Sequence, residues 1–203
     1  GTAGMRGLLG PGTNRINLHT IRKANEGFAA YIEAQGEEAK QRGVAIGYDN
    51  RHMSPEFAMD SARVLAKHGI RSYVFESLRP TPELSFAVRY FHCFGGIMVT
   101  ASHNPKEYNG YKLYDEKGCQ LVPALAQQVI DRVNAVKDEL AITADVSAEE
   151  EKLITVIGKE VDEEYYKNVL SIQLNPDVDK DLIKIIFTPE HGTANIPVKE
   201  VYT

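Results

Sequence analysis

The stretch Gly95-Gly96-Ile97-Met98-Val99-Thr100-Ala101-Ser102-His103-Asn104-Pro105 joins a short apolar run to a polar loop. An apolar run bounded by glycines is typical of a strand that is covered on both faces of a sheet. Pro105 disfavours a helical conformation at Asn104, and Asn109-Gly110 is a second turn signal, so an exposed loop should follow the strand. Ser102 would leave the edge of the sheet in that loop, although a lone loop serine is more often a turn ligand than a nucleophile.

Outward from this stretch, strand and helix signals alternate along the chain. Caps and breakers at Asn17, Gly43, Ser54-Pro55, Gly69 and Thr81-Pro82 mark the helix ends. We predict helices over residues 14–42, 54–68, 81–91 and 124–140, and strands over residues 44–48, 70–75, 97–100 and 111–114. This order predicts a three-layer α/β/α domain with a mostly parallel sheet, in which ligands gather beyond the carboxyl ends of the strands.

The composition changes after residue 140. Residues 141–160 are rich in Asp and Glu, and we predict that they form a linker with a short helix capped at Ser147. From residue 161 a helical pattern leads to a strand signal at 183–187, which cannot bury both faces of a sheet alone. We therefore expect a first domain over residues 1–140 and the truncated start of a second α/β domain over 161–203.

The overall composition excludes several classes of protein. The chain has 203 residues, 43% hydrophobic and 25% charged, as in ordinary soluble domains. Apolar runs are too short for a membrane span, and the net charge of −5 without a basic tract argues against a nucleic-acid surface. Cys93 and Cys119 are too few and too far apart for a disulfide framework or a zinc site. We expect a cytoplasmic protein with reduced thiols that binds neither membranes nor nucleic acid; its oligomeric state cannot be inferred from the sequence.

Three motifs resemble those of a known family. Residues 100–105 are similar to the active-site serine loop of the α-D-phosphohexomutases, the phosphoglucomutase and phosphomannomutase family. Gly110-Tyr111-Lys112 resembles the next segment of that family, and Gly1-Thr2-Ala3-Gly4-Met5-Arg6-Gly7 resembles its amino-terminal motif. The run from Gly1 to Asn17 is most like bacterial phosphoglucomutases, and residues 188–194 resemble the start of the family's second domain.

The resemblance implies a reaction in which Ser102 carries a phosphoryl group. Phospho-Ser102 would transfer it to a sugar monophosphate, and the resulting bisphosphate would reorient and return its other phosphate to the serine. Glucose 1-phosphate and glucose 6-phosphate are the expected substrates, with glucose 1,6-bisphosphate as activator and intermediate. The resemblance also implies Mg²⁺, for which this chain would supply one ligand, the phosphate on Ser102. The family's aspartate-rich metal loop and its substrate loop are absent from the 203 residues, so we expect an inactive amino-terminal fragment.

The resemblance assigns catalytic or substrate-binding positions to Arg6, Ser102, His103, Asn104 and Lys112. A histidine titrates near neutrality and a desolvated lysine can be lowered toward it, so His103 and Lys112 are candidates for proton transfer. The alternative is that His103 only orients the loop and Lys112 only neutralises phosphate. Arg6 suits phosphate geometry and is expected to hold both the loop and the phosphate, while Asn104 is expected to fix the loop.

Other interpretations remain open at this point. The sugar could be that of a phosphomannomutase or phosphopentomutase, or the chain could be a non-catalytic sugar-phosphate binding domain. A hydrolase would use Ser102 with His103, but neighbours in extended backbone point to opposite faces of the strand. Asp49 and Arg51 resemble a further family segment, and we interpret them as structural rather than catalytic.

Overall fold

The computed structural model describes residues 4–202. Gly1, Thr2 and Ala3 of the predicted amino-terminal motif lie outside the described residues. Six strands form one sheet in the order β1-β5-β4-β2-β3-β6. Their bounds are β1 Gly4–Leu8, β2 Val44–Tyr48, β3 Ser72–Phe75, β4 Gly95–Val99, β5 Tyr108–Tyr114 and β6 Ile154–Ile157. β2, β3, β4 and β6 are mutually parallel, whereas β5 runs antiparallel to both β4 and β1.

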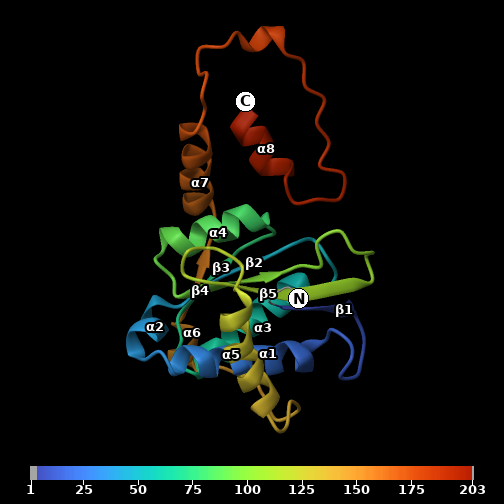
Figure 1. Ribbon diagram of the computed structural model, residues 1–203, viewed down its shortest axis with the longest axis vertical. Coiled ribbons are helices and arrows are strands. Elements are labelled where there is room, and N and C mark those ends of the chain that lie inside the picture. Colours follow the sequence, from blue (N-terminus) through green and yellow to red (C-terminus); the bar gives the residue numbers. More distant parts are fainter. Residues whose placement is uncertain (1–3, 203) are drawn as a thin grey trace.

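Helices cover both faces of this sheet (Figure 1). On one face lie α1 Leu18–Glu33, α3 Ser54–Lys67 and α5 Pro123–Ala135, with the short α2 Glu37–Arg42 beside α1. On the other face lies α4 Thr81–Tyr90, against which α7 Lys159–Ser171 packs. Alternate strand residues fill the two layers: Ile46 and Ile97 belong to the first core, and Ala45 and Met98 belong to the second. The predicted three-layer fold is therefore confirmed.

Several predicted element bounds needed correction. The helix expected over residues 14–42 is two helices, because Gly36 adopts a φ of 96° between them. Asn17 caps α1 as predicted, but Ser54 lies inside α3, and Met53 takes the cap position with a left-handed backbone. The helix expected to reach residue 140 ends at Ala135, where the next residue turns to an extended conformation.

The stretch expected to be a linker is in part a component of the sheet. After the short helix α6 Ala148–Glu151, capped by Ser147, strand β6 pairs with β3 from Ser72↔Ile154 to Phe75↔Ile157. The linker prediction for residues 141–160 is therefore wrong at β6, and the sheet extends beyond residue 140. The division of the chain into two domains stays a prediction.

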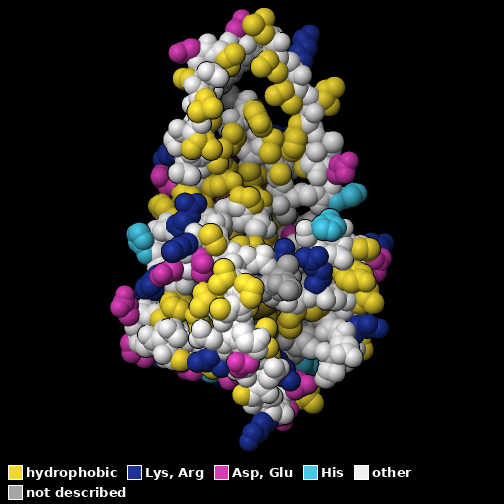
Figure 2. Space-filling view, in the orientation of Figure 1, with side chains coloured by type: hydrophobic (Ala, Val, Ile, Leu, Met, Phe, Trp, Pro, Cys, Tyr) yellow, Lys and Arg dark blue, Asp and Glu magenta, His cyan; other side chains and the backbone are white. Residues whose placement is uncertain are grey.

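Residues 172–194 form an extended arm above α4, which is visible at the top of Figure 1. The arm includes the short 3-10 turn η1 Lys180–Leu182 and leads into α8 Asn195–Tyr202, which packs on α7. The strand predicted over residues 183–187 is absent, because no strand of the described chain lies beside it to complete the backbone hydrogen bonds. Hydrophobic side chains of this arm are exposed (Figure 2). They include Ile183, Ile185 and Ile186.

A close approach between α1 and α5 depends on Gly27. A Cβ atom at Gly27 would lie 2.6 Å from the backbone nitrogen of Val133 and would also contact its side chain. We expect Gly27→Ala to lower the free energy of unfolding by about 2 kcal/mol, because overpacking outweighs the gain in helix propensity. Urea denaturation would measure this change. Gly7→Ala is the matched control, since its Cβ would meet only Ile16 Cγ1 at 3.7 Å; an equal loss in both variants would contradict the packing argument.

Candidate active site

The candidate site lies where β2 and β4 end side by side. The chain leaves β2 toward β3 on one side, and leaves β4 toward β5 on the other side. Such a reversal opens a crevice beyond the carboxyl ends of two neighbouring parallel strands. Asp49 follows β2 and Ser102 follows β4 at this place, which we call the carboxyl edge. The topology therefore places Asp49 and Ser102 at the same edge of the sheet.

Ser102 is exposed in the segment of residues 100–108, here called the serine loop. Its φ is 57°, a left-handed conformation that is uncommon for a residue other than glycine. Its backbone N–H donates to Thr100 Oγ1 at 2.9 Å, and its Oγ lies 3.3 Å from His103 Nδ1. The expectation that neighbouring side chains would point apart was wrong, because Ser102 is not extended. The structure brings Ser102 and His103 together.

Arg6 reaches the serine loop from β1. Its Nη1 donates to Asn104 Oδ1 at 2.9 Å. β1 pairs with β5 so that Arg6 lies opposite Gly110 and Gly4 lies opposite Lys112. Arg6 and Lys112 are thus diagonal neighbours on one face of the sheet. The contact expected between Arg6 and the serine loop is present in the structure.

The surroundings of Lys112 lower the pKa of its ammonium group. Burial lowers its pKa, and the positive charge of Arg6 lowers it further, while Asp49 opposes the shift. A lowered lysine pKa suits either proton transfer or a response to an arriving phosphate. Both roles that the sequence left open for Lys112 therefore stay open.

Asp49 is buried at the end of β2 and holds the serine loop through hydrogen bonds. Its Oδ1 accepts hydrogen bonds from the Arg51 backbone N–H at 3.0 Å and from Ser54 Oγ at 2.8 Å, and its Oδ2 accepts from Thr100 Oγ1 at 2.6 Å. Thr100 in turn accepts from Ser102. Among the described residues, the hydrogen bonds that Asp49 accepts thus hold the loop, and none of them comes from His103, the histidine that the carboxylate of a Ser-His hydrolase would orient.

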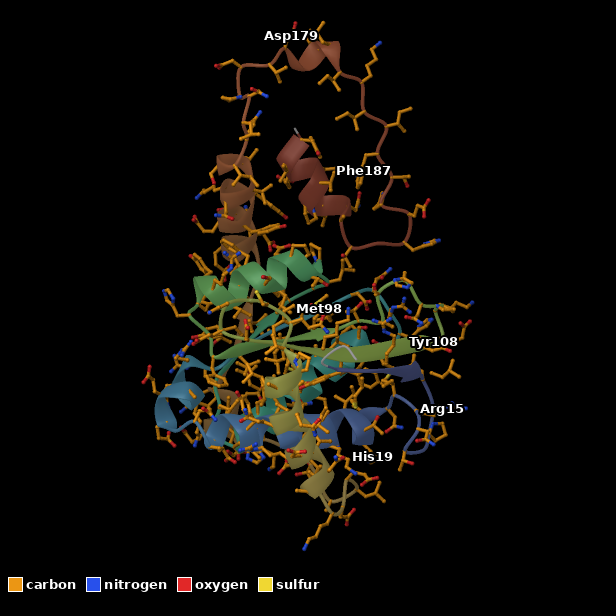
Figure 3. All side chains as sticks on the ribbon, viewed as in Figure 1. Arg15, His19, Met98, Tyr108, Asp179 and Phe187 are labelled. Atoms are coloured by element: carbon orange, nitrogen blue, oxygen red, sulfur yellow. The ribbon has the colours of Figure 1, made fainter. Side chains whose placement is uncertain are left out.

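Arg51 and Asn109 are the loop-holding residues whose contacts sequence reasoning missed. Arg51 donates to four carbonyl oxygens of the serine loop. Asn109 Nδ2 donates to the carbonyl of His52 and to Ser54 Oγ, both at 2.9 Å, which joins the end of the loop to the start of α3. The available signal was the Asp-x-Arg spacing directly after a strand that neighbours β4. The side chain of Tyr108, labelled in Figure 3, marks the far end of this loop beside β1.

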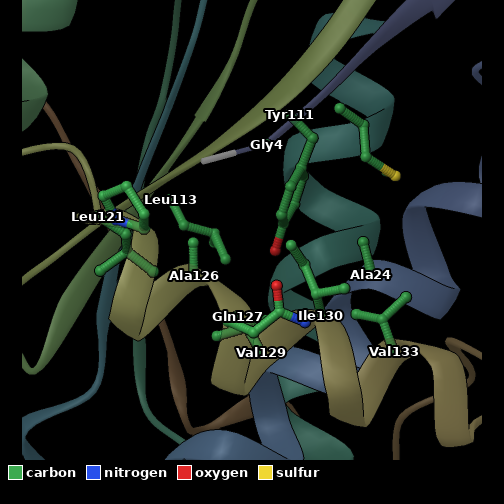
Figure 4. A pocket seen from close by; sticks show the side chains of 12 residues that line it. Gly4, Ala24, Tyr111, Leu113, Leu121, Ala126, Gln127, Val129, Ile130 and Val133 are labelled. Atoms are coloured by element: carbon green, nitrogen blue, oxygen red, sulfur yellow. The ribbon is translucent and has the colours of Figure 1, made fainter. Parts of the chain in front are cut away.

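An apolar hollow lies away from the serine loop. A cavity of about 270 Å³ is lined by residues of β1, β5, α1 and α5, with Gln127 its polar side chain on α5 (Figure 4). The Tyr111 ring faces it, and burial raises the pKa of Tyr111, whose hydroxyl donates to Asn25 Oδ1. This hollow has none of the cations that gather at the serine loop.

The fold and the site together describe a three-layer α/β/α domain that exposes a serine where the strand order reverses. Residues 1–140 match the family described as phosphoglucomutase/phosphomannomutase, alpha/beta/alpha domain I. The chain belongs to this phosphoglucomutase/phosphomannomutase family.

Individual relatives agree with the family assignment. The chain is 41% identical over 199 residues to the phosphoglucomutase of Staphylococcus epidermidis strain RP62A, which covers 98% of this chain and 35% of the relative. It is 40% identical over 205 residues to the phosphoglucomutase of Staphylococcus saprophyticus, covering 100% of this chain and 36% of that protein. The chain thus spans about a third of the length of these relatives.

Solved structures share the fold. The parafusin phosphoglucomutase of Paramecium, in its open form, superposes with a TM-score of 0.72 at 22% identity, covering 100% of this chain and 40% of that one. A phosphoglucomutase/phosphomannomutase family protein of Burkholderia thailandensis gives a TM-score of 0.68 at 19% identity, covering 99% and 40%. Within residues 4–202, no helix is long and apolar enough to cross a membrane.

Proposed function

We propose that the protein containing this chain is a hexose phosphate mutase, and that the chain supplies the half of its active site that carries the phosphoryl group. One observation carries the proposal: Ser102 is exposed in a loop that is tied down at both ends, with His103 in contact and Arg6 bound to the same loop. The Staphylococcus relatives are named phosphoglucomutases. Glucose 1-phosphate and glucose 6-phosphate are therefore the sugars we propose.

Each residue has a role in this proposal. The Ser102 hydroxyl accepts the phosphoryl group from a sugar bisphosphate and returns one to a sugar monophosphate. His103 Nδ1 is placed to take or return the hydroxyl proton. Arg6 and Lys112 offer positive charge to the phosphoryl oxygens, and Arg6 and Asn104 together fix the side of the loop that faces the sugar.

The family resemblance also implies Mg²⁺, and the described residues do not form a site for it. In residues 4–202 there is no group of three or more His, Cys, Asp or Glu side chains that could hold a metal ion. Asp49, the carboxylate beside the serine loop, has both oxygens engaged. Because the relatives are about three times longer, we propose that the metal carboxylates and the sugar contacts come from a later part of a longer polypeptide, with glucose 1,6-bisphosphate as its activator.

Phosphoryl labelling tests the proposed function directly. We expect the full-length polypeptide, incubated with glucose 1,6-bisphosphate that carries a labelled phosphate, to become labelled on Ser102. Peptide mass spectrometry would locate the label, and parallel reactions with mannose and pentose bisphosphates would compare the sugars. A label on another residue, or no label at all, would refute a phosphoserine mutase. Labelling without conversion of sugar monophosphates would instead favour a sugar-phosphate binding domain.

A further inference from the structure

The guanidinium of Arg51 has its hydrogen-bond donors committed to the serine loop. Nη1 donates to the carbonyl oxygens of Pro105 at 2.8 Å and Tyr108 at 3.0 Å. Nη2 donates to those of Ser102 at 2.8 Å and Asn104 at 2.6 Å. The remaining nitrogen, Nε, lies 3.3 Å from Asp49 Oδ2. A guanidinium has five N–H groups in a fixed plane, and four of them are used on carbonyls of one loop.

This commitment separates Arg51 from Arg6. The side chain of Arg51 is 11% exposed, and its charge is faced by the buried carboxylate of Asp49. A phosphate would have to displace loop carbonyls to bind Arg51. Arg6, by contrast, is exposed and has a single loop contact through Nη1. Arg51 is therefore suited to hold backbone, whereas Arg6 is free to meet a ligand.

Ser102 is held through both of its backbone polar groups. Its carbonyl oxygen accepts from Arg51, and its N–H donates to Thr100 Oγ1, which is bound to Asp49. Asp49 and Arg51 thus fix the two peptide groups that flank the Ser102 Cα. The left-handed φ of 57° at Ser102 costs energy in a residue with a Cβ, and such a conformation persists when surrounding bonds determine it.

We propose that Arg51 is a positioning residue for Ser102: with Asp49 and Thr100 it holds the serine in its left-handed conformation, so that Oγ faces outward beside His103. The effect of Arg51 on phosphoryl transfer rests on the proposed function. Its role in holding the backbone of Ser102 rests on the geometry alone. Alignment of a nucleophile contributes to the rate of the chemical step without adding affinity. Arg51 therefore acts on phosphoryl transfer and not on binding of the sugar bisphosphate.

The test replaces Arg51 by lysine, whose three donors cannot span four carbonyl oxygens. In the full-length polypeptide, Arg51→Lys should slow labelling of Ser102 by glucose 1,6-bisphosphate roughly 100-fold, with a change of less than about 2-fold in the half-saturating concentration. In the 203-residue chain, hydrogen exchange of the backbone amides of residues 101–108 should become about tenfold faster. Arg63→Lys, at an exposed arginine on α3, is the matched control and should change neither.

A second pair of variants tests the link through Thr100. Thr100→Val removes the acceptor for the Ser102 N–H and should slow labelling, whereas Thr100→Ser keeps a hydroxyl and should restore it. Unchanged labelling and exchange in Arg51→Lys would overturn the proposal, as would a raised half-saturating concentration at an unchanged maximal rate. If the unmodified polypeptide is not labelled at Ser102, the proposed function fails, and the exchange measurement alone decides whether Arg51 holds the loop.

Discussion

Ser102→Ala is expected to abolish mutase activity in the full-length polypeptide, by roughly 10³-fold or more, because it removes the atom that carries the phosphoryl group. Ser102 is exposed, and its backbone bonds to Thr100 and Arg51 do not involve the hydroxyl. The variant should therefore fold as the parent does. A coupled assay for glucose 6-phosphate, with circular dichroism to check the fold, would measure both.

Two further substitutions sharpen this experiment. Ser102→Gly also removes the hydroxyl but suits the left-handed backbone, so it should be as inactive and slightly more stable. Ser171→Ala, at an exposed serine at the end of α7, is the control and should keep full activity. Activity within about tenfold of the parent in either Ser102 variant would show that another group carries the phosphate.

Glu83→Gln is expected to remove a large pH dependence from the stability of the chain. Glu83 is fully buried, and neither of its carboxylate oxygens has a hydrogen-bond partner among the described residues. Burial raises its pKa from 4.5 to about 8, with Asp162 adding to the shift and Arg79 opposing it. Arg79 Nε lies 3.8 Å from Glu83 Oε1 but is bound to Asp162 at 2.7 Å. Glu83 is thus left without a hydrogen bond from Arg79.

The direction of the effect follows from proton binding. The folded chain keeps the proton on Glu83 up to about pH 8, while the unfolded chain loses it near pH 4.5. The contribution of Glu83 to the free energy of unfolding is therefore greatest below pH 4.5, and it decreases as the pH rises from 4.5 to about 8. Glu83→Gln has no such loss and should be more stable than the parent by about 3 kcal/mol at pH 7, and about equal to it at pH 4.

The control for this experiment has a similar local sequence. Ser54-Pro55-Glu56 and Thr81-Pro82-Glu83 both begin a helix, but Glu56 is exposed. Glu56→Gln should leave the pH dependence unchanged. Urea denaturation at pH 4, 7 and 9 would compare the variants, and parallel stability curves for Glu83→Gln and the parent would contradict a protonated Glu83.

Local sequence signals predicted the elements that depend on neighbours in the chain. The apolar run of β4, the cap at Asn17 and the proline at the start of α4 each act within a few residues, and all three elements are present. β6 was missed because four residues in an acidic stretch form a strand only against β3, about 80 positions earlier in the chain. The strand predicted at 183–187 was wrong for the converse reason, since its apolar residues have no partner strand.

The site divides in the same way. Ser102, His103, Asn104 and Arg6 could be named from motifs, and the structure brings Arg6 to Asn104 and Ser102 to His103. The contacts of Arg51 could not be predicted from the sequence, because its four acceptors are backbone carbonyls 51–57 residues away. Every residue has a backbone carbonyl, so the amino-acid type does not indicate which of them accepts a hydrogen bond. The left-handed backbone at Ser102 could not be predicted either, because the usual signal for such a conformation is a glycine, and this position holds a serine.

The arm of residues 172–194 begins at the end of α7 that points away from the sheet, and it returns to the carboxyl edge (Figure 1). It leaves through α7, which follows β6 and is fixed by the two bonds from Arg79 to Asp162, and it returns where Asn50 Nδ2 donates to the carbonyl of His191 at 2.8 Å. Asn50 stands between Asp49 and Arg51. The return of the arm is therefore bound to the residue between the two that hold Ser102, and one peptide unit separates this contact from Asp49 and from Arg51.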